Sequence, residues 1–572
     1  MNKGKKLLSA SVLLIFTTTI FAQIASFPGA EGFGSKATGG RNGRVIYVTN
    51  LNVSGAGSLQ AALNETGKRY ILFKVSGIIP GTMEVPIGNG DFTLAGQTSP
   101  SGIIVRGFQS YNGDQKSASN IIIRHLRSRI GDIKKYPSNY WIAEDGITLG
   151  GVQNAIIDHC SFGHASDEAV DISRSSKLTI QNCLLAETLG GHWELGGMLI
   201  NYSSSGAILD SLSIHHNIWN RIGGRMPEIS CETSYCNGKT INLELSENLI
   251  WDPKIELWYE GTTGQNGFFN LRMNAVNNYS YANSGFGNAM FHFDMLSLSA
   301  NKLYFSGNQL NLYPQYKDYQ LFYCCNDFNK YNPNTTNGIA QKATSRFDFP
   351  TITYQPIIEL RSYMFKNAGA FPRDQMDNRL MSFVNTGTFD LKSQNEDHYG
   401  DTFLHPTSKN PPLDSDGDGI PDYWEKLKGL NPLIQDHNGT QLSSLITGVD
   451  GYTNLECYLN CLSDALVNGQ STSNCQINLD ITSNVENQSS QIFNISYYPN
   501  PAQEILHITI PQPIVEKSQI SILNSLGKIL EKKWVENSSF NVDISAFESG
   551  IYFLKYTAEG KVILSRKVIV IK

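Results

Sequence analysis

Three carboxylates lie within five residues of one another in the segment SDEAVDI, Ser166 to Ile172. The flanking segments AIIDHCSF and KLTIQNC are apolar and strand-like, so these acids do not belong to an ordinary solvated loop. Asp167 and Asp171 are four residues apart, about 13 Å on a straight strand. That is too far for one ion with oxygen ligands at about 2.4 Å. Either the chain bends between them or only one of them binds a cation.

A further acid, Asp145 in EDGITL, precedes Asp167 by 22 residues. That spacing is about one coil of the repeat described below, so we expect Asp145 to lie directly beneath Asp167. Three acids from two coils would then converge on one cation. The alternative is a set of surface acids spaced by chance, or a capped turn, and the spacing alone does not decide between them.

One arginine, Arg225 in HHNIWNRIGGRMPEI, lies immediately before Met226 and Pro227. An arginine beside a proline-fixed turn is usually a salt-bridge partner or a clamp for a phosphate or carboxylate. Catalysis by Arg225 is the less common alternative on residue type alone.

A second acidic segment, Asp414 to Glu425, fits the calcium-loop pattern D-x-D-x-D-G-x5-E at every position. Calcium takes six to eight oxygen ligands, and glycine at the sixth position allows the sharp turn. We expect a structural Ca²⁺ site, with a merely acidic linker as the alternative. The expected ligands are the side chains of Asp414, Asp416, Asp418 and Glu425, the carbonyl of Ile420, and Asp422 through a water.

Short apolar runs separated by Gly, Asn and Ser recur between residues 40 and 310, whereas helical periodicity is scarce. Seven runs share an apolar pair followed by His or Asn, which indicates an internal repeat. The intervals are 34, 23, 35, 31, 30 and 30 residues, and the shared positions are His125, His159, Asn182, Asn217, Asn248, Asn278 and Asn308.

Repeats of this length predict a right-handed parallel β-helix, whose coils stack at about 4.8 Å and bury a common core. Amide side chains stacked at one bend can hydrogen-bond along the ladder. Leucine-rich horseshoes have shorter periods, and a propeller needs four strands in each repeat. Cys160 and Cys183 each follow a ladder residue, so they are expected to stack as a disulfide or a buried thiol pair.

The chain ends and the composition divide the remaining sequence. Residues 1–22 resemble a cleaved secretory signal, and no later segment has the roughly 18 apolar residues that a membrane span needs. The net charge of -6 argues against a nucleic-acid partner, and we expect a monomer. The predicted domains are the β-helix at 23–395, a calcium-loop module at 396–465, a polar linker at 466–492 and a small β-sandwich at 493–572.

The segments FPGAEGFG, TGGR, LAGQTSP, EDGITL, IIDHCSF, SDEAVDI, LTIQN, HHN and RMP occur in this order. Over about residues 26–390 the chain therefore resembles polysaccharide lyase family 1, the pectate lyases. The resemblance implies Ca²⁺-dependent β-elimination of α-1,4-linked polygalacturonate. It assigns Asp145, Asp167 and Asp171 to the metal and Arg225 to the C5 proton. A guanidinium normally stays protonated, so Arg225 either becomes transiently neutral or stabilises the enolate.

The sequence departs from the family pattern at three places. An acidic ligand of the family falls on Ala143, a second arginine falls on Ser230, and a substrate-binding lysine has no counterpart in LLAETLGGHWELGG. Arg221 and His192 are the candidates that remain for binding the acidic polysaccharide.

The C-terminal segments YPNPA, NSLGK, GIYFLK and KVIVIK resemble the type IX secretion sorting domain. This implies passage through that secretion machinery and a secreted or cell-surface protein. The competing functions are a non-catalytic glycan-binding surface β-helix, a lyase for another uronate polymer, and an inverting glycoside hydrolase, which would need paired acids across the scissile bond.

Overall fold

The computed structural model describes residues 23–110, 118–190, 196–202, 208–231, 234–259, 269–323, 339–390, 392, 396–470, 496–510, 518–524, 528–558 and 561–572. The chain divides into two compact units, residues 1–482 and 483–572. The predicted signal peptide and residues 471–492 of the predicted linker lie outside the described residues. In these ranges, none of the helices combines the length and the apolar content needed to cross a bilayer.

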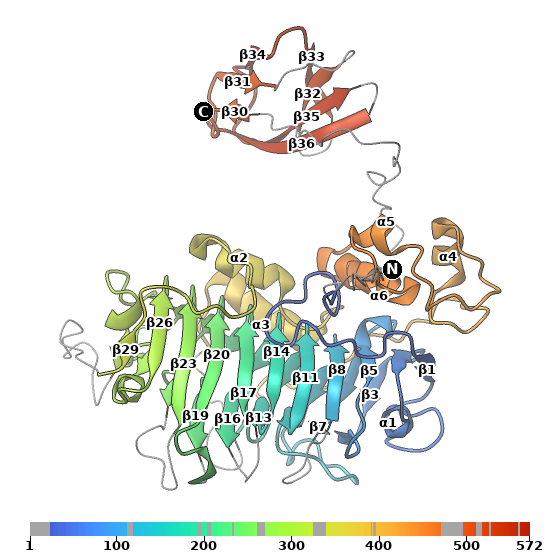
Figure 1. Ribbon diagram of the computed structural model, residues 1–572, viewed down its shortest axis with the longest axis vertical. Helices are drawn as coiled ribbons and strands as arrows, with labels where there is room; N and C mark the ends of the chain where they lie inside the picture. The colour runs from blue at the N-terminus through green and yellow to red at the C-terminus, as the bar shows by residue number, and fades with distance from the viewer. Residues whose placement is uncertain are drawn as a thin grey trace, which may run out of the picture. The chain divides into compact units, whose positions relative to one another are not determined.

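Three parallel sheets wind through the first unit and confirm the predicted parallel β-helix (Figure 1). Most coils place one strand in each sheet, and we name the sheets A, B and C.

Sheet A contains β1 (Arg44–Val48), β2 (Arg69–Phe73), β5 (Phe92–Ala95), β8 (Ala118–Arg124), β11 (Val152–Asp158), β14 (Ser176–Gln181), β17 (Asp210–His215), β20 (Thr240–Ser246), β23 (Asn270–Val276), β26 (Lys302–Ser306) and β29 (Gln341–Lys342). Sheet B contains β3 (Gly77–Ile79), β6 (Ile103–Val105), β9 (Arg127–Arg129), β12 (Ser161–Gly163), β15 (Leu184–Ala186), β18 (Ile218–Asn220), β21 (Leu249–Trp251), β24 (Tyr279–Tyr281) and β27 (Gln309–Leu310). Sheet C contains β4 (Met83–Glu84), β7 (Phe108–Ser110), β10 (Ile147–Gly150), β13 (Val170–Ser173), β16 (Met198–Tyr202), β19 (Glu228–Cys231) and β22 (Trp258–Tyr259). β25 (Phe291–His292) and β28 (Phe322–Tyr323) form a short additional pair.

Aliphatic side chains stack in register along the inside of sheet A. Ile123, Ile157, Ile180 and Ile214 are paired from β8 to β17, and all four are buried in the main core. Full burial of such a side chain contributes about 1.5–3 kcal/mol. Each coil therefore depends on its neighbours for its apolar core, as the repeat predicted.

The asparagine ladder forms at the end of sheet A. The side-chain amide of Asn217 donates to Asn248 over 3.2 Å, that of Asn248 donates to Asn278 over 3.0 Å, and that of Asn278 donates to Asn308 over 2.9 Å. The backbone N–H of Cys183 donates to the side-chain oxygen of Asn217. Every rung thus satisfies buried polar groups of the next coil.

The predicted ladder was wrong by one residue in its first half. Gln181 pairs with His215, so Asn182 is level with His216, and Asn217 is level with Cys183. His125, His159 and Asn182 therefore occupy the neighbouring column, where the two histidine rings stack at 5.1 Å. The apolar pattern fits both alignments because His216 and Asn217 are both polar, and only the backbone pairing distinguishes them.

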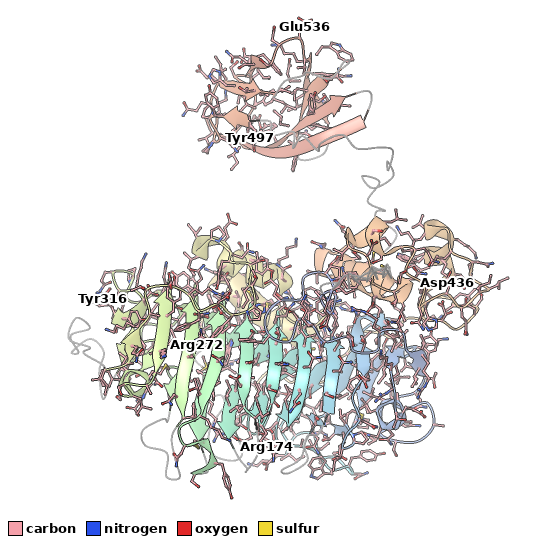
Figure 2. All side chains as sticks on the ribbon, in the orientation of Figure 1. Arg174, Arg272, Tyr316, Asp436, Tyr497 and Glu536 are labelled. Atoms are coloured by element: carbon pink, nitrogen blue, oxygen red, sulfur yellow. A yellow bond between two sulfur atoms is a disulfide. The ribbon has the colours of Figure 1, made fainter. Side chains whose placement is uncertain are left out.

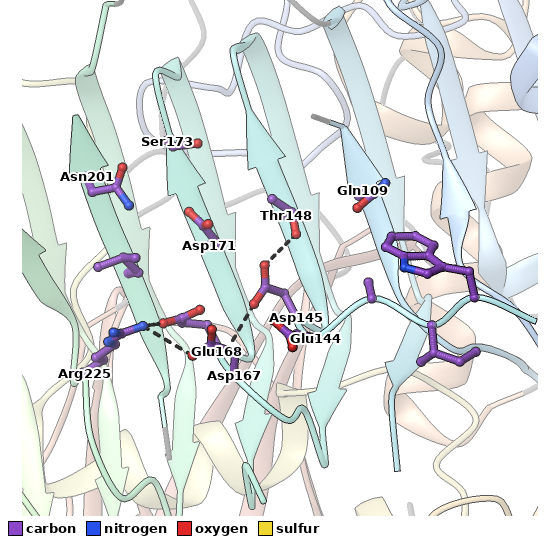
Figure 3. Close-up of a pocket in the computed structure, with 14 residues that line it drawn as sticks. Gln109, Glu144, Asp145, Thr148, Asp167, Glu168, Asp171, Ser173, Asn201 and Arg225 are labelled. Atoms are coloured by element: carbon purple, nitrogen blue, oxygen red, sulfur yellow. Dashed lines mark hydrogen bonds and ion pairs between the residues drawn. The ribbon is translucent and has the colours of Figure 1, made fainter. Parts of the chain in front are cut away.

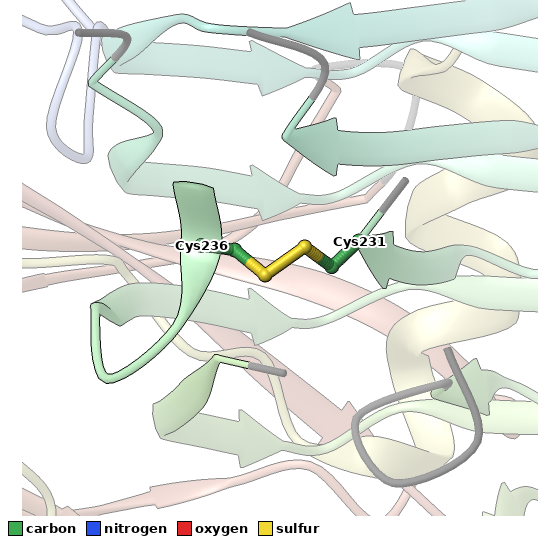
Figure 4. Close-up of a disulfide and its surroundings, with 2 residues drawn as sticks. All are labelled: Cys231 and Cys236. Atoms are coloured by element: carbon green, nitrogen blue, oxygen red, sulfur yellow. A yellow bond between two sulfur atoms is a disulfide. The ribbon is translucent and has the colours of Figure 1, made fainter. Parts of the chain in front are cut away.

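The predicted cysteine pair lies where the repeat places it. Cys160 and Cys183 are buried free thiols, and the backbone N–H of Cys160 donates to the sulfur of Cys183 over 3.4 Å. A local disulfide joins Cys231, the last residue of β19, to Cys236 (Figure 4). This bond joins the end of β19, the strand that follows Arg225 in the chain, to the short 3-10 helix Ser234–Cys236.

Other segments cover the outer faces of sheets A and B. Helices α2 (Ile357–Asn367) and α3 (Gln375–Thr386) pack on sheet B, where Leu360 and Met376 meet Leu184 and Trp251. The N-terminal segment crosses sheet A, where the backbone N–H of Gly34 donates to Thr179. A short helix, α1 (Leu59–Asn64), follows β1.

The calcium-loop module also packs on sheet A, over the first strands (Figure 1). Ile420 and Trp424 share an apolar cluster with Tyr70 and Leu72 of β2. The module contains α4 (Asp422–Lys428), α5 (Ser443–Thr447) and α6 (Asn454–Asn468). It therefore belongs to the same compact unit as the β-helix, and α6 extends a few residues into the predicted linker.

The second unit is the predicted β-sandwich. One antiparallel sheet contains β30 (Ser496–Tyr498), β31 (Ile505–Thr509) and β34 (Ser539–Asp543), and the other contains β32 (Gln519–Asn524), β33 (Ile529–Trp534), β35 (Gly550–Ala558) and β36 (Lys561–Val570). Residues of both sheets, among them Ile508 and Leu554, form its core.

Candidate active site

A pocket of about 530 Å³ lies on the outer face of sheet C (Figure 3). Side chains paired in register across neighbouring strands line its floor: Gln109, Thr148, Asp171 and Leu199. Apart from Asp171, the charged residues come from the turns that lead into β10, β13 and β19. Sheet C therefore aligns the pocket along the axis of the β-helix.

Asp145 lies beside Glu168, one residue from the predicted position. Ile147 of β10 pairs with Val170 of β13, so the offset between these coils is one residue longer than the distance from Asp145 to Asp167. The backbone N–H of Glu168 donates to Asp145 over 3.3 Å. The backbone N–H of Asp167 donates to the carbonyl of Glu144 over 3.2 Å.

In the described part of the chain, the acidic group on this face consists of Asp145, Asp167 and Glu168, each with an oxygen within 4.8 Å of the others. Sequence reasoning named only the aspartates and missed Glu168. A signal was present, because aligning the apolar pair Ile147 and Leu149 with Val170 and Ile172 places Glu168 on Asp145.

Asp171 lies on β13, paired with Thr148 and half-buried in the same pocket. It is outside the group of three acids that approach one another within 4.8 Å. The chain bends before β13, so Asp167 and Glu168 lie at the entrance of the strand, whereas Asp171 points from the strand itself (Figure 3).

Arg225 reaches the acids from two coils away. Its guanidinium forms ion pairs with Glu168 and, at 3.4 Å, with Asp167, while Nε lies 3.3 Å from Glu228. Its backbone has a positive φ of 50°, which is uncommon for a residue with a side chain. The turn before Pro227 thus directs the arginine toward the pocket.

The pocket holds more negative than positive charge. Burial, assisted by the neighbouring carboxylates of Asp167 and Glu144, raises the pKa of Asp145 to about 7, although a hydrogen bond from Thr148 opposes the shift. Desolvation and like charges both disfavour an ionised carboxylate. A divalent cation with a preference for oxygen ligands would relieve both effects.

Of the two predicted substrate-binding residues, Arg221 and His192, only Arg221 lies among the described residues. Arg221 is buried and paired with Glu187 at 2.8 Å and Asp390 at 2.7 Å, beneath the segment after α3, and it does not line the pocket. His192 lies outside the described residues.

The residues of the predicted calcium loop lie together in the module. Asp414, Asp416 and Asp418 form one acidic group, and Asp418 forms a second with Glu425 and Asp436. Burial and the neighbouring aspartates raise the pKa of Glu425 to about 8. Asp422 instead accepts hydrogen bonds of 2.8 Å from the backbone and hydroxyl of Ser415, and the side chain of Ile420 is buried. Sequence reasoning missed Asp436.

Comparisons with known proteins extend these observations. The chain is 31% identical over 475 residues to a probable pectate lyase C of Aspergillus flavus, and 32% identical over 475 residues to one of Aspergillus oryzae. Each alignment covers 81% of this chain and 99% of the relative. Residues 496–572 match the family described as secretion system C-terminal sorting domain. Among solved structures, a pectate lyase bound to hexasaccharide covers 61% of this chain and 98% of its own, with 16% identity and a TM-score of 0.38.

Proposed function

The chain belongs to the pectate lyase family, and we propose that it cleaves polygalacturonate by β-elimination in the pocket on sheet C. The observation that supports this assignment is the convergence of Asp145, Asp167 and Glu168 with Arg225 in one pocket. The family membership makes the protein a polysaccharide lyase, and the residue roles below are our proposal.

The acidic group fits calcium. All of its donor atoms are carboxylate oxygens, which calcium prefers, and burial and the like charges of Asp167 and Glu144 disfavour the ionised form of Asp145, which a bound cation would favour. We propose Asp145, Asp167 and Glu168 as ligands, with Asp171 contributing from the floor of the pocket. When bound, calcium would attract the uronate carboxylate and stabilise negative charge that develops beside it.

Arg225 is proposed to receive the proton from C5 of the uronate. The electron pair of that C–H bond then forms the C4–C5 double bond, and the C4–O bond breaks so that the glycosidic oxygen leaves with its electron pair on the neighbouring sugar and takes up a proton from water. A guanidinium is ordinarily protonated, and Arg225 lies among carboxylates that stabilise its positive charge. The base role therefore requires a neutral arginine at the moment of transfer, and otherwise its N–H groups stabilise the enolate.

The floor of the pocket suits an extended polysaccharide. Neighbouring strands of a sheet are about 4.8 Å apart, so Gln109, Thr148 and Asp171 repeat polar groups at regular steps along the axis. Ser173 pairs with Asn201 two residues further along β13 and β16, on the same face of the sheet, and both line the pocket. A chain of sugars that crosses the strands would meet hydrogen-bonding groups at successive coils.

The test uses purified protein and the ultraviolet absorbance of the 4,5-unsaturated product. Polygalacturonate, methyl-esterified pectin, rhamnogalacturonan and alginate are compared with added calcium and with chelator. We expect absorbance to rise on polygalacturonate with calcium and to stop in chelator and in Arg225→Ala. Arg44→Ala, at an exposed ion pair with Glu65, serves as the control. If product forms only from another of these polymers, that polymer is the substrate instead of polygalacturonate. If no polymer gives product, the proposed lyase activity is rejected.

The second unit bears on where the reaction occurs. Its match to a secretion sorting domain makes this a secreted or cell-surface protein. We propose that the type IX secretion machinery recognises the sandwich, and that the enzyme acts on polysaccharide outside the cell.

A further inference from the structure

We propose a second calcium site in the module, built from two loops, that fastens the module to the first coils of the β-helix. Its ligands are Asp414, Asp416, Asp418 and Glu425 together with Asp436, which lies outside the calcium-loop pattern. The site is separate from the catalytic pocket on sheet C and does not depend on the proposed reaction.

The strongest observation is the state of Glu425. Its side chain is fully buried, and neither carboxylate oxygen accepts a hydrogen bond from the described residues. One oxygen of Asp416 is in the same state. A buried carboxylate without a partner is costly, and proteins avoid it by pairing the charge or coordinating a metal. Glu425 also has an oxygen within 4.8 Å of those of Asp418 and Asp436, so it is directed at the other acids.

Asp436 completes the acidic group from a second loop. Its backbone N–H donates to Asp418 over 3.0 Å, which holds this loop against the first. Because Asp418 belongs to both acidic groups, we treat them as one centre with five carboxylates. Figure 2 shows Asp436 on the same module as α4. Calcium takes six to eight oxygens, and five carboxylates supply most of them.

The observed role of Asp422 explains why a fifth acid is needed. Calcium loops of this pattern commonly use the ninth position through a water. Here that residue, Asp422, binds Ser415 with both oxygens and so closes the loop on itself. Asp436 takes over the contribution that the pattern assigns to Asp422.

The same loop holds the module on the β-helix. The hydroxyl of Tyr47, on β1, donates to Asp414. Gly419 lies so close to Leu72 of β2 that a Cβ atom on it would be 2.8 Å from the leucine methyl. Ile420 follows directly and is buried in the interface with β2. Ordering this loop around an ion therefore orders the surface that covers sheet A.

The experiment compares full-length wild type, Glu425→Gln, Asp436→Asn and the exposed control Asp450→Asn. Equilibrium dialysis counts bound calcium, and thermal unfolding is followed in calcium and in chelator. We expect Glu425→Gln to bind one ion fewer than wild type and to lose most of the rise in Tm that calcium produces. In chelator its Tm should exceed that of wild type, because the amide removes buried charge. Asp436→Asn should lower the affinity of this site for calcium by at least about tenfold.

Two further comparisons make the outcome decisive. Tyr47→Phe should keep the ion count but reduce the calcium-dependent rise in Tm, because it removes the link between the loop and β1. Glu168→Gln should keep this ion, since it alters only the pocket on sheet C. Equal ion counts and equal Tm shifts in wild type, Glu425→Gln and Asp436→Asn would overturn the site. An unchanged shift in Tyr47→Phe would overturn its coupling to the β-helix.

Discussion

Arg225 and Glu168 form an ion pair across two coils, and Gly196 lies on the coil between them. A Cβ atom on Gly196 would be 3.1 Å from Cγ of Glu168 and 3.3 Å from Cδ of Arg225. The absence of a side chain at this position is what allows the two charged groups to meet. Gly196 is therefore part of the construction of the pocket, although it contributes no functional group.

Replacing Gly196 with valine should separate Arg225 from the acids. A displacement of about 1 Å in a reacting group can cost about 100-fold in rate, and we expect a loss of that size in kcat on polygalacturonate. Gly287→Val is the matched control, because a Cβ atom at Gly287 meets no other atom within 4 Å. Equal loss in both variants would point to general destabilisation instead.

Substitution of Glu168 tests the acid that sequence reasoning missed. If Glu168 is a calcium ligand, Glu168→Gln should raise the calcium concentration for half-maximal activity by about tenfold or more. Asp171→Asn should have a smaller effect, because Asp171 stands outside the closely spaced acidic group. The measurement is the initial rate of product formation over a calcium titration. A larger effect from Asp171→Asn would reverse the two assignments.

Trp141 is an exposed aromatic residue in the lining of the pocket. Its side chain is 61% exposed, which suits an apolar face against which a sugar ring can stack. Losing an aromatic contact of about 1.4 kcal/mol corresponds to about tenfold in affinity. We therefore expect Trp141→Ala to raise KM about tenfold while kcat changes little. The control is Trp534→Ala, which removes a similarly exposed tryptophan from the sandwich. A comparable rise in KM in this control would show that Trp141 has no specific role in binding the sugar.

Asp374 gives the fold a specific acid sensitivity. It caps α3 and binds Arg129 of β9 through contacts of 2.7 and 3.0 Å. Burial alone would raise the pKa of Asp374, but the ion pairs with Arg129 and Arg127 lower this pKa to about 2. A lowered native pKa stabilises the folded state above the unfolded pKa near 3.8, and this contribution is lost as the pH falls toward 2.

The corresponding variant, Asp374→Asn, should be less stable at pH 7 by about 3–5 kcal/mol, because it leaves two buried arginines, Arg127 and Arg129, to share the single carboxylate of Asp377. Its stability should also change less between pH 4 and pH 2 than that of wild type. Urea unfolding over this pH range measures both effects, with the exposed Asp450→Asn as control. A variant with the wild-type pH profile would show that Asp374 does not carry this dependence.

Much of the fold could be predicted because a solenoid is built from contacts between neighbouring coils. Each coil must place aliphatic residues such as Ile157 inside and turn residues at its corners. The same pattern of apolar and turn residues therefore recurs in each repeat of the sequence. The register between neighbouring coils is harder to predict from the sequence than the fold. Asn182 and Asn217 occupy equivalent positions when the repeats are aligned by sequence, yet backbone pairing puts Asn182 level with His216.

The sequence by itself determined the parallel β-helix, the calcium-loop pattern and the sandwich at the C-terminus, and only its family resemblance predicted that Asp145, Asp167 and Arg225 share one site. Only the tertiary structure decided that Glu168 joins these residues, that Arg221 is buried elsewhere, and that Asp436 faces Glu425. Local pattern records which side of a strand or loop a residue occupies. Which side chains meet across coils and loops depends on register and on packing between distant segments, and a single missing Cβ at Gly196 is enough to decide it.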